Sequence, residues 1–185
     1  MIAIKKKTVK KEIIRNIKDI TSSSLFHWNL YEEVVDTNQK LAVELNKKYK
    51  TKSTFQLVHI IYKQNQQYKS PHYPAFLALF QEIINKTVKR DVILLRMKVN
   101  LLFKSNKKAI NIFHTDDTLD PNFFSTIYYV DDSDGDTVVY DNKKLIKIKP
   151  EAGKVLLFNG GLHHASSSPV KNKIRKVVNI NFKYA

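Results

Sequence analysis

The segment RMKVNL, at residues 96–101, alternates polar and apolar side chains with the period of a β-strand. Arg96, Lys98 and Asn100 would point to one face of a sheet, and the residues between them to the other. Further short segments of this kind follow, at residues 111–116, 125–130, 137–140, 145–149, 154–159 and 176–183. Asp, Asn, Gly and Pro residues separate them, as expected of turns. Because no long helix interrupts the series, it predicts an antiparallel sandwich or small barrel over residues 91–185.

The first ninety residues are predicted to be mainly helical. Apolar side chains recur at helical spacing over residues 10–20, 28–49 and 74–88. Residues 62–73 (YKQNQQYKSPHY) are polar and aromatic, which is typical of a surface loop and compatible with a lid. We expect one domain, residues 1–185, with a helical buttress and lid loop over 1–90 and a strand-rich core over 91–185. The expected fold class is mainly β with N-terminal helices (α+β).

The composition excludes several classes of protein. A chain of 185 residues that is 43% hydrophobic can form one substantial core, and it is not expected to be disordered. No apolar run approaches the ~18 residues of a membrane-spanning helix, and no secretory signal is expected. The chain has no cysteine, which excludes a disulfide framework, a thiolate metal site and a cysteine nucleophile. A cytoplasmic location fits this composition.

The formal net charge of +15 has two interpretations. It could serve binding to nucleic acid, or it could be a solvated, lysine-rich surface. Only four of the 32 basic residues are arginine, the residue whose planar fork matches phosphate geometry. The solvated surface is therefore the favoured interpretation, and nucleic acid stays open as a partner.

Candidate metal ligands lie in the strand-rich part. His114 and Asp116 are two residues apart at the end of a predicted strand, so their side chains would converge on one side. A strand-end histidine beside a solvated aspartate is the alternative for this pair alone. His163 and His164 follow another predicted strand, and only one of these neighbours could join the pair. Two histidines and one carboxylate on one face of a metal ion are typical of non-haem iron(II) oxygenases.

Arg175 follows His164 by eleven residues and leads into the last predicted strand. An isolated arginine at this point could hold the far carboxylate of a keto acid through a bidentate pair. The alternative is a surface ion pair, which would contribute little to stability.

This order of residues resembles that of the iron(II)/2-oxoglutarate-dependent dioxygenases, most closely the prolyl-4-hydroxylase-like branch with its small phage and marine-virus members. The resemblance spans residues 92–184. It includes IYYV at 127–130, DGDT at 134–137, the KP–G–F pattern at 149–158, and residues 164–182. The family fold is a double-stranded β-helix, a jelly-roll or cupin-like core buttressed by N-terminal helices, which agrees with the strand pattern.

The resemblance implies a role for each candidate residue. The implied iron(II) ligands are His114, Asp116 and His164. The Ala-Ser-Ser-Ser-Pro sequence that follows favours His164 over His163 as the distal ligand. Arg175 would pair with the 5-carboxylate of 2-oxoglutarate, Tyr129 would donate a hydrogen bond to the same group, and Asn100 would lie near the co-substrate.

The implied activity couples decarboxylation of 2-oxoglutarate to succinate with hydroxylation of a substrate C–H bond. It would use Fe(II) and O2, with ascorbate as a candidate reductant. A prolyl or other protein residue is the leading substrate, since eight aspartates within residues 116–141 would give the site an acidic rim. A small molecule is also compatible, and the oligomeric state is not predicted.

Two alternatives stay open, one within the same superfamily and one without catalysis. The first is oxidation of nucleic acid, because aromatic residues interleaved with lysines in residues 62–73 could stack on bases. Packing of the same residues on the helical layer is the competing interpretation. The second is a catalytically silent jelly-roll binding module.

Overall fold

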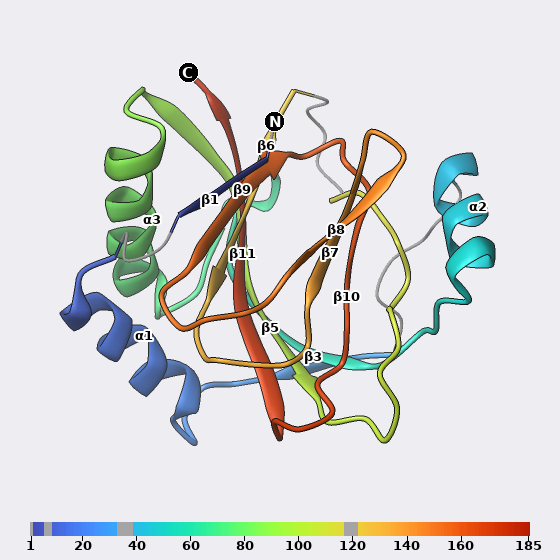
Figure 1. Cartoon of the computed structure of the whole chain (residues 1–185). Helices are drawn as coiled ribbons and strands as arrows, with labels where there is room; N and C mark the ends of the chain where they lie inside the picture. Colours follow the sequence, from blue (N-terminus) through green and yellow to red (C-terminus); the bar gives the residue numbers. More distant parts are fainter. Residues whose placement is uncertain (1, 6–8, 33–38, 117–121) are drawn as a thin grey trace.

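The computed structural model describes residues 2–5, 9–32, 39–116 and 122–185, and it contains two antiparallel β-sheets (Figure 1). In spatial order, the large sheet consists of β1 (Ile2–Lys5), β9 (Val155–Asn159), β6 (Phe124–Tyr129), β11 (Ile174–Tyr184), β5 (Val92–Phe103), β3 (Gln56–Lys63) and β2 (Asn29–Tyr31), with β4 (Tyr68–Lys69) paired to β3. The small sheet consists of β10 (His164–Ser166), β7 (Thr137–Asp141) and β8 (Lys144–Ile148). The α-helices are α1 (Lys11–Ser22), α2 (Lys40–Tyr49) and α3 (Tyr73–Thr87).

Strand β11 is central to the large sheet and positions much of the site. It pairs with β5 on one side and with β6 on the other. Its apolar residues Val178 and Ile180 join the core beneath the helices. Because strand side chains alternate, Arg175, Val177 and Asn179 point to the other face, where they line a pocket. One face of this strand therefore packs beneath the helices, and the other lines the pocket.

Three apolar clusters hold the layers together. The largest lies between the large sheet and the helices α1 and α3, and Phe76 of α3 is fully buried in it. The second contains Val139 of the small sheet and Phe158 of the large sheet. In the third, Leu45 of α2 packs against Val138 of the small sheet. Figure 1 shows α1 and α3 on one side of the sheets and α2 on the other. The expected fold class is confirmed: a mainly β, jelly-roll core buttressed by helices.

Two of the three predicted helices agree with helices of the structure. Helices α1 and α3 lie within two residues of the predicted ranges, and Pro74 occupies the first turn of α3. The predicted helix over residues 28–49 is wrong in its first part, because Asn29–Tyr31 pairs with β3 as strand β2. Helix α2 begins only at Lys40. Residues 33–38, including two of the apolar positions that favoured a helix, lie outside the described residues.

The first ninety residues also contribute strands that the sequence pattern did not predict. The most extensive is β3, which lies between β5 and β2 in the large sheet. In its sequence, QLVHIIYK, apolar residues occupy both odd and even positions. All of its side chains are partly or fully buried. It therefore lacks the alternation that identifies a half-exposed strand. Residues 1–90 are thus a mixture of helices and sheet strands and not a helical layer alone.

Residues 111–116 form isolated β-bridges instead of the predicted regular strand. The Asn111 and His114 backbones each bridge to a neighbouring segment. Between them, the Phe113 N–H donates to the Asn46 side chain of α2 at 2.8 Å, so a side chain takes the place of a strand partner. This segment is held at both ends and leads directly into the site.

Residues 62–73 are not a free loop. The segment continues β3 through a 3₁₀ turn, η1 (Gln64–Gln66), into β4 and the start of α3. The rings of Tyr62 and Tyr73 stack at 5.3 Å and pack against the core beneath the helices. The ring centroids of His72 and the buried Phe26 are 5.1 Å apart. The packing interpretation holds for Tyr62, His72 and Tyr73, whereas Tyr68 of β4 is 43% exposed.

In the part of the chain that the structure describes, no helix is long and apolar enough to span a membrane.

Candidate metal centre

Backbone pairing brings the two predicted histidine ligands together. His114 and His164 form an antiparallel bridge in which each N–H donates to the other residue's carbonyl, at 3.0 and 2.9 Å. Their ring centroids are therefore only 4.6 Å apart. Asp116 lies two residues beyond His114, and its Oδ2 is 3.8 Å from His164 Nε2. One ligand atom from each of the three residues lies within 4.8 Å of the others. We call His114, Asp116 and His164 the triad.

Both histidines have Nδ1 beside a backbone carbonyl, which leaves Nε2 available to a metal ion. His114 Nδ1 lies 3.0 Å from the Ile112 carbonyl oxygen, and His164 Nδ1 lies 3.0 Å from that of Leu162. Because a carbonyl can only accept, Nδ1 carries the proton in each neutral ring, and Nε2 keeps its lone pair. Anchoring of the second ring nitrogen in this way is the usual support of metal-bound histidines. The ring geometry therefore fits a metal at the triad.

The histidine at the start of the triad is neutral at ordinary pH. The pKa of His114 is lowered to about 3, mainly by burial and secondly by repulsion from His164. A neutral imidazole is the form that binds metal ions.

The Asp116 carboxylate is almost fully buried and is saturated with hydrogen-bond donors. Its donors are Arg96 Nη2 at 2.8 Å and Asn179 Nδ2 at 3.0 Å to Oδ1, and Ser125 Oγ at 2.6 Å and Asn181 Nδ2 at 2.9 Å to Oδ2. A carboxylate offers about four lone-pair positions, so a metal ion must replace or share one of these contacts.

The surroundings keep Asp116 ionised. Burial alone would raise the pKa of this carboxyl group, but His164, Arg96 and Lys98 hold it far below its usual range. The triad therefore offers two imidazole nitrogens and one negative oxygen. This donor set suits a divalent transition metal such as iron(II) and leaves half of an octahedron open.

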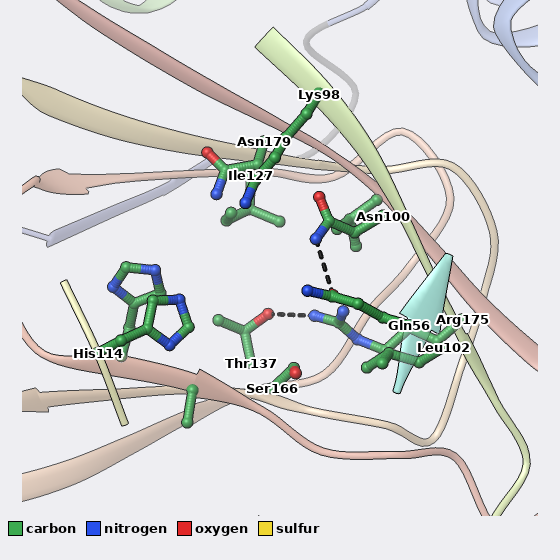
Figure 2. A pocket seen from close by; sticks show the side chains of 13 residues that line it. Gln56, Lys98, Asn100, Leu102, His114, Ile127, Thr137, Ser166, Arg175 and Asn179 are labelled. Carbon is green, nitrogen blue, oxygen red and sulfur yellow. Dashed lines mark hydrogen bonds between the residues drawn. The ribbon is translucent and has the colours of Figure 1, made fainter. Parts of the chain in front are cut away.

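A pocket extends from the triad histidines between the two sheets (Figure 2). It is lined by Gln56, Lys98, Asn100, Leu102, His114, Ile127, Thr137, His164, Ala165, Ser166, Arg175, Val177 and Asn179. Two triad residues are thus part of its wall, and Arg175 lies farther along it (Figure 2). The four residue steps along β11 from Arg175 to Asn179 correspond to about 13 Å.

Arg175 is a buried cation without a carboxylate partner in the described part of the chain. It is 3% exposed. Its Nε donates to the Gly135 carbonyl and its Nη2 to Thr137 Oγ1, both at 2.7 Å. The nearby Asp136 forms an ion pair with Lys108 instead. Burial lowers the pKa of Arg175, yet a guanidinium stays charged in proteins. A buried unpaired charge is costly, so this end of the pocket fits an anion.

The remaining predicted site residues occupy different positions. Asn100 lines the pocket and donates to Gln56 Oε1 at 2.9 Å (Figure 2). Tyr129 is fully buried behind Thr137, and its hydroxyl lies 2.8 Å from Thr137 Oγ1. His163 is not part of the cluster that His164 joins.

Several residues of the site were not predicted from the sequence. Asn179 and Asn181 hold Asp116, and they are polar residues at alternate positions of an otherwise apolar strand, VVNINF. That pattern is a signal that could have identified them. Arg96 and Thr137 depend on how separate strands pair, and no local pattern indicates their roles.

The expected acidic rim is not formed by the turn between β6 and β7. In this turn Asp131 forms ion pairs with Lys18 and Lys176, and Asp134 accepts three backbone N–H groups from residues 170–172. Asp134 directly precedes Gly135, whose carbonyl accepts from Arg175, so it lies toward the Arg175 end of the pocket. Residues 117 and 120 of the aspartate-rich stretch lie outside the described residues.

Comparison with protein-family models and with curated proteins finds no match. Solved structures do match. An oxidoreductase of the 2OG-Fe(II) oxygenase family from Burkholderia pseudomallei has a TM-score of 0.72 at 14% identity, over 98% of this chain and 84% of that chain. A prolyl-4-hydroxylase from Pseudomonas putida has a TM-score of 0.55 at 11% identity, over 100% and 92%.

A third match is HygX from Streptomyces hygroscopicus, whose structure contains nickel, 2-oxoglutarate and hygromycin B. Its TM-score is 0.59 at 11% identity, over 100% of this chain and 83% of that chain. At these identities the similarity concerns the fold. The chain has the fold of the 2OG-Fe(II) oxygenases, as the sequence resemblance implied.

Proposed function

We propose that this chain is an iron(II)- and 2-oxoglutarate-dependent dioxygenase that hydroxylates a C–H bond of its substrate. The observation that carries the proposal is the presence, in one pocket, of the triad histidines and of the buried Arg175, which has no carboxylate partner among the described residues. A metal site and an anion site that share a pocket suit an anionic co-substrate that chelates the metal. The common fold with oxygenases of this type supports the proposal.

In this proposal the triad holds iron(II), and Arg175 holds the 5-carboxylate of 2-oxoglutarate. When bound, iron(II), 2-oxoglutarate and dioxygen supply the oxidation: one oxygen atom enters succinate as carbon dioxide leaves, and the other enters the substrate C–H bond.

The protein contributes positioning and exclusion of water. The carbonyl groups of Ile112 and Leu162 orient the two imidazoles through their Nδ1–H groups. Apolar side chains of the pocket wall, such as Ile127 and Val177, limit the access of water to the reacting groups. Arg175 orients the keto acid along the pocket, which reduces the entropic cost of reaching the reactive geometry.

For the substrate, we propose a peptide or protein side chain, with a prolyl residue as the first candidate. The sequence resemblance to the prolyl-4-hydroxylase-like branch supports this choice, and so does the shared fold with the Pseudomonas putida enzyme. A small molecule is the alternative, since HygX binds hygromycin B in the same fold. Of the aromatic residues that suggested nucleic acid, Tyr62 and Tyr73 pack against the core, whereas Tyr68 is exposed.

The experiment measures succinate formed from 2-oxoglutarate by the purified chain with Fe(II), with and without pools of proline-containing peptides. We expect iron-dependent succinate and peptides heavier by one oxygen atom. Asp116→Ala should abolish both, because the triad loses its only anionic ligand. Asp19→Ala is the control, since this carboxylate lies on the exposed surface of α1 in an ion pair with Arg15.

Full turnover by Asp116→Ala would contradict the assignment of the triad. Succinate formation with no oxidised peptide from proline-containing pools would remove the prolyl substrate and leave the oxygenase activity.

A further inference from the structure

We infer that the substrate of this chain carries an anionic group, a carboxylate or a phosphate, close to the carbon that is oxidised, and that Lys98 binds this group beside the triad. The inference rests on the proposed function and narrows the class of its substrate. The charge is opposite in sign to the one that an acidic rim would favour.

The register of the large sheet places Lys98 beside the triad. Lys98 of β5 pairs with Asn179 of β11, and the Asn179 side chain donates to Asp116 at 3.0 Å. Figure 2 shows the Lys98 side chain reaching into the pocket beside Asn179. The pKa of His114, which is lowered mainly by burial, is lowered further by Lys98. The ammonium group is therefore close enough to act on the triad.

The wall of the pocket is cationic. Lys98 and Arg175 are among the residues that line it, and none of the lining residues in the described part of the chain is an aspartate or a glutamate. The one carboxylate of the triad, Asp116, already accepts a hydrogen bond from Arg96 at 2.8 Å. A cleft that is lined by one sign of charge concentrates ligands of the opposite sign.

The keto acid accounts for only one of the two cations in the wall. In the proposed function Arg175 holds its distal carboxylate, and its other carboxylate binds the metal. Four bonds of about 1.5 Å join its two carboxyl carbons, which are thus at most about 6 Å apart. Asn179, the partner of Lys98, lies about 13 Å from Arg175 along β11. An anion at Lys98 has therefore to come from the substrate.

Lys98 can bind such an anion and keep a contact with the protein. An ammonium group carries three donor hydrogens on a flexible stem, so one or two of them can turn toward a ligand. A carboxylate and a phosphate both offer several acceptor oxygens to such a group.

Asn179 adds a second condition on the substrate. Its Nδ2 faces Asp116, and since an ionised carboxylate can only accept, the orientation of the amide is fixed. Its Oδ1 is buried and has no hydrogen-bond partner among the described residues, although the side chain lines the pocket. A buried acceptor without a donor is costly. This oxygen suits an N–H or O–H group next to the anion, as in an acylated amino acid or a hydroxy acid.

The test compares matched pools of small compounds in the Fe(II)- and 2-oxoglutarate-dependent formation of succinate. N-acetyl amino acids and 2-hydroxy acids are matched with their neutral amides, and phosphate monoesters with their parent alcohols. We expect at least one anionic pool to raise succinate formation roughly tenfold or more above its neutral partner. The two kinds of anionic pool distinguish a carboxylate from a phosphate. Equal responses to anionic and neutral pools, or no response to any anionic pool, would overturn the inference.

Binding without turnover is measured on the same pools by proton NMR, with protein loaded with Mn(II) and 2-oxoglutarate under nitrogen. Mn(II) broadens the signals of compounds that bind close to it, so anionic members should broaden more than neutral ones. Lys98→Met keeps the apolar stem and removes the charge, and we expect roughly 10- to 100-fold weaker binding of the anionic members. Lys98→Arg keeps the charge and should retain most of the broadening. Lys147→Met, at an exposed position of β8, is the control.

Calorimetric titration of every variant with Mn(II) and 2-oxoglutarate separates the possible failures. If the Mn(II)-loaded parent chain binds no 2-oxoglutarate, the proposed function is wrong. If Lys98→Met weakens 2-oxoglutarate binding and keeps the preference for anions, Lys98 serves the co-substrate and the inference is overturned. Mn(II) affinity reports whether the pocket is folded, and Lys98→Arg together with the pools on the parent chain keeps the test valid if Lys98→Met is misfolded.

Discussion

Arg96 Nη2 donates to Asp116 Oδ1 at 2.8 Å, so the only anionic member of the triad already faces a cation from strand β5. Arg96 also donates from Nε to Asn181 Oδ1 at 2.9 Å. The arginine therefore orients the carboxylate through two routes and at the same time repels an incoming metal ion.

Replacing this charge should strengthen metal binding. In Arg96→Gln, an amide can still donate to Asp116, but the repulsion of the metal ion is gone. We expect metal affinity to rise roughly three- to tenfold, which corresponds to about 0.7–1.4 kcal/mol. Titration with Mn(II) measures the change, and Arg15→Gln, at an exposed position on α1, is the control. Weaker binding by Arg96→Gln would mean that its orienting role outweighs its charge.

Asn181 should be important for stability as well as for the site. It is fully buried, donates to both Asp116 and Ser125 at 2.9 Å, and accepts from Arg96. Asn181→Leu leaves these buried groups short of partners, and we expect a loss of about 2–4 kcal/mol in the free energy of unfolding. Urea denaturation measures it, with the exposed Asn106→Ala as the control. Equal stability of the two variants would show that the network is dispensable for folding.

Gly135→Ala should damage the anion end of the pocket selectively. A Cβ at this position would lie 2.4 Å from the Ser167 carbonyl oxygen and 3.0 Å from Arg175 Cδ. Since the first contact is backbone, the turn must shift and carry Arg175 with it, and overpacking of this kind costs about 1–3 kcal/mol. We expect weaker binding of 2-oxoglutarate and unchanged binding of Mn(II). In the control Gly161→Ala, the nearest atom is a side-chain oxygen at 3.2 Å.

The stability of the metal-free protein should fall as the pH is lowered from neutrality. The pKa of His114 is lowered from 6.5 to about 3, so the unfolded chain binds a proton below about pH 6.5 and the native chain does not. Between pH 7 and pH 5 this difference removes as much as about 2 kcal/mol. Asp116 acts in the same direction, because its pKa is also lowered, but only near and below the ordinary aspartate pKa of about 4.

The measurement compares urea unfolding at these two pH values, in the presence of a chelator, for the parent and for His114→Gln. The variant should lose less stability on acidification than the parent. His59 and His163 also have pKa values lowered by burial, and they contribute equally to both proteins. An identical loss in both proteins would contradict the lowered pKa of His114.

The triad can be predicted from the sequence because its geometry is largely local. Because His114 and Asp116 are two residues apart, their side chains point to the same side of the backbone. One antiparallel β-bridge then places His164 next to His114. The choice between His163 and His164 follows from strand alternation together with the family resemblance. Long segments with one clear period, such as α3 and β11, are predictable for the same reason.

Other features depend on long-range pairing and escape such reasoning. Strand β3 is buried on both faces, so its sequence carries no alternation, and its place between β5 and β2 is set by tertiary contacts. Arg96 donates a hydrogen bond to Asp116, which lies 20 residues later in the sequence. Arg175 donates one to Thr137, which lies 38 residues earlier. Such contacts follow from the register of several strands, which no single segment encodes.

The central claim is that the triad holds one metal ion while Arg175 holds an anionic co-substrate in the same pocket. A crystal structure of the chain with Mn(II) and 2-oxoglutarate, grown without oxygen, tests it most directly. We expect one ion about 2.0–2.3 Å from His114 Nε2, His164 Nε2 and an Asp116 oxygen, with the distal carboxylate of the ligand against Arg175. An ion bound elsewhere, or a ligand that leaves Arg175 without a carboxylate, would contradict the account.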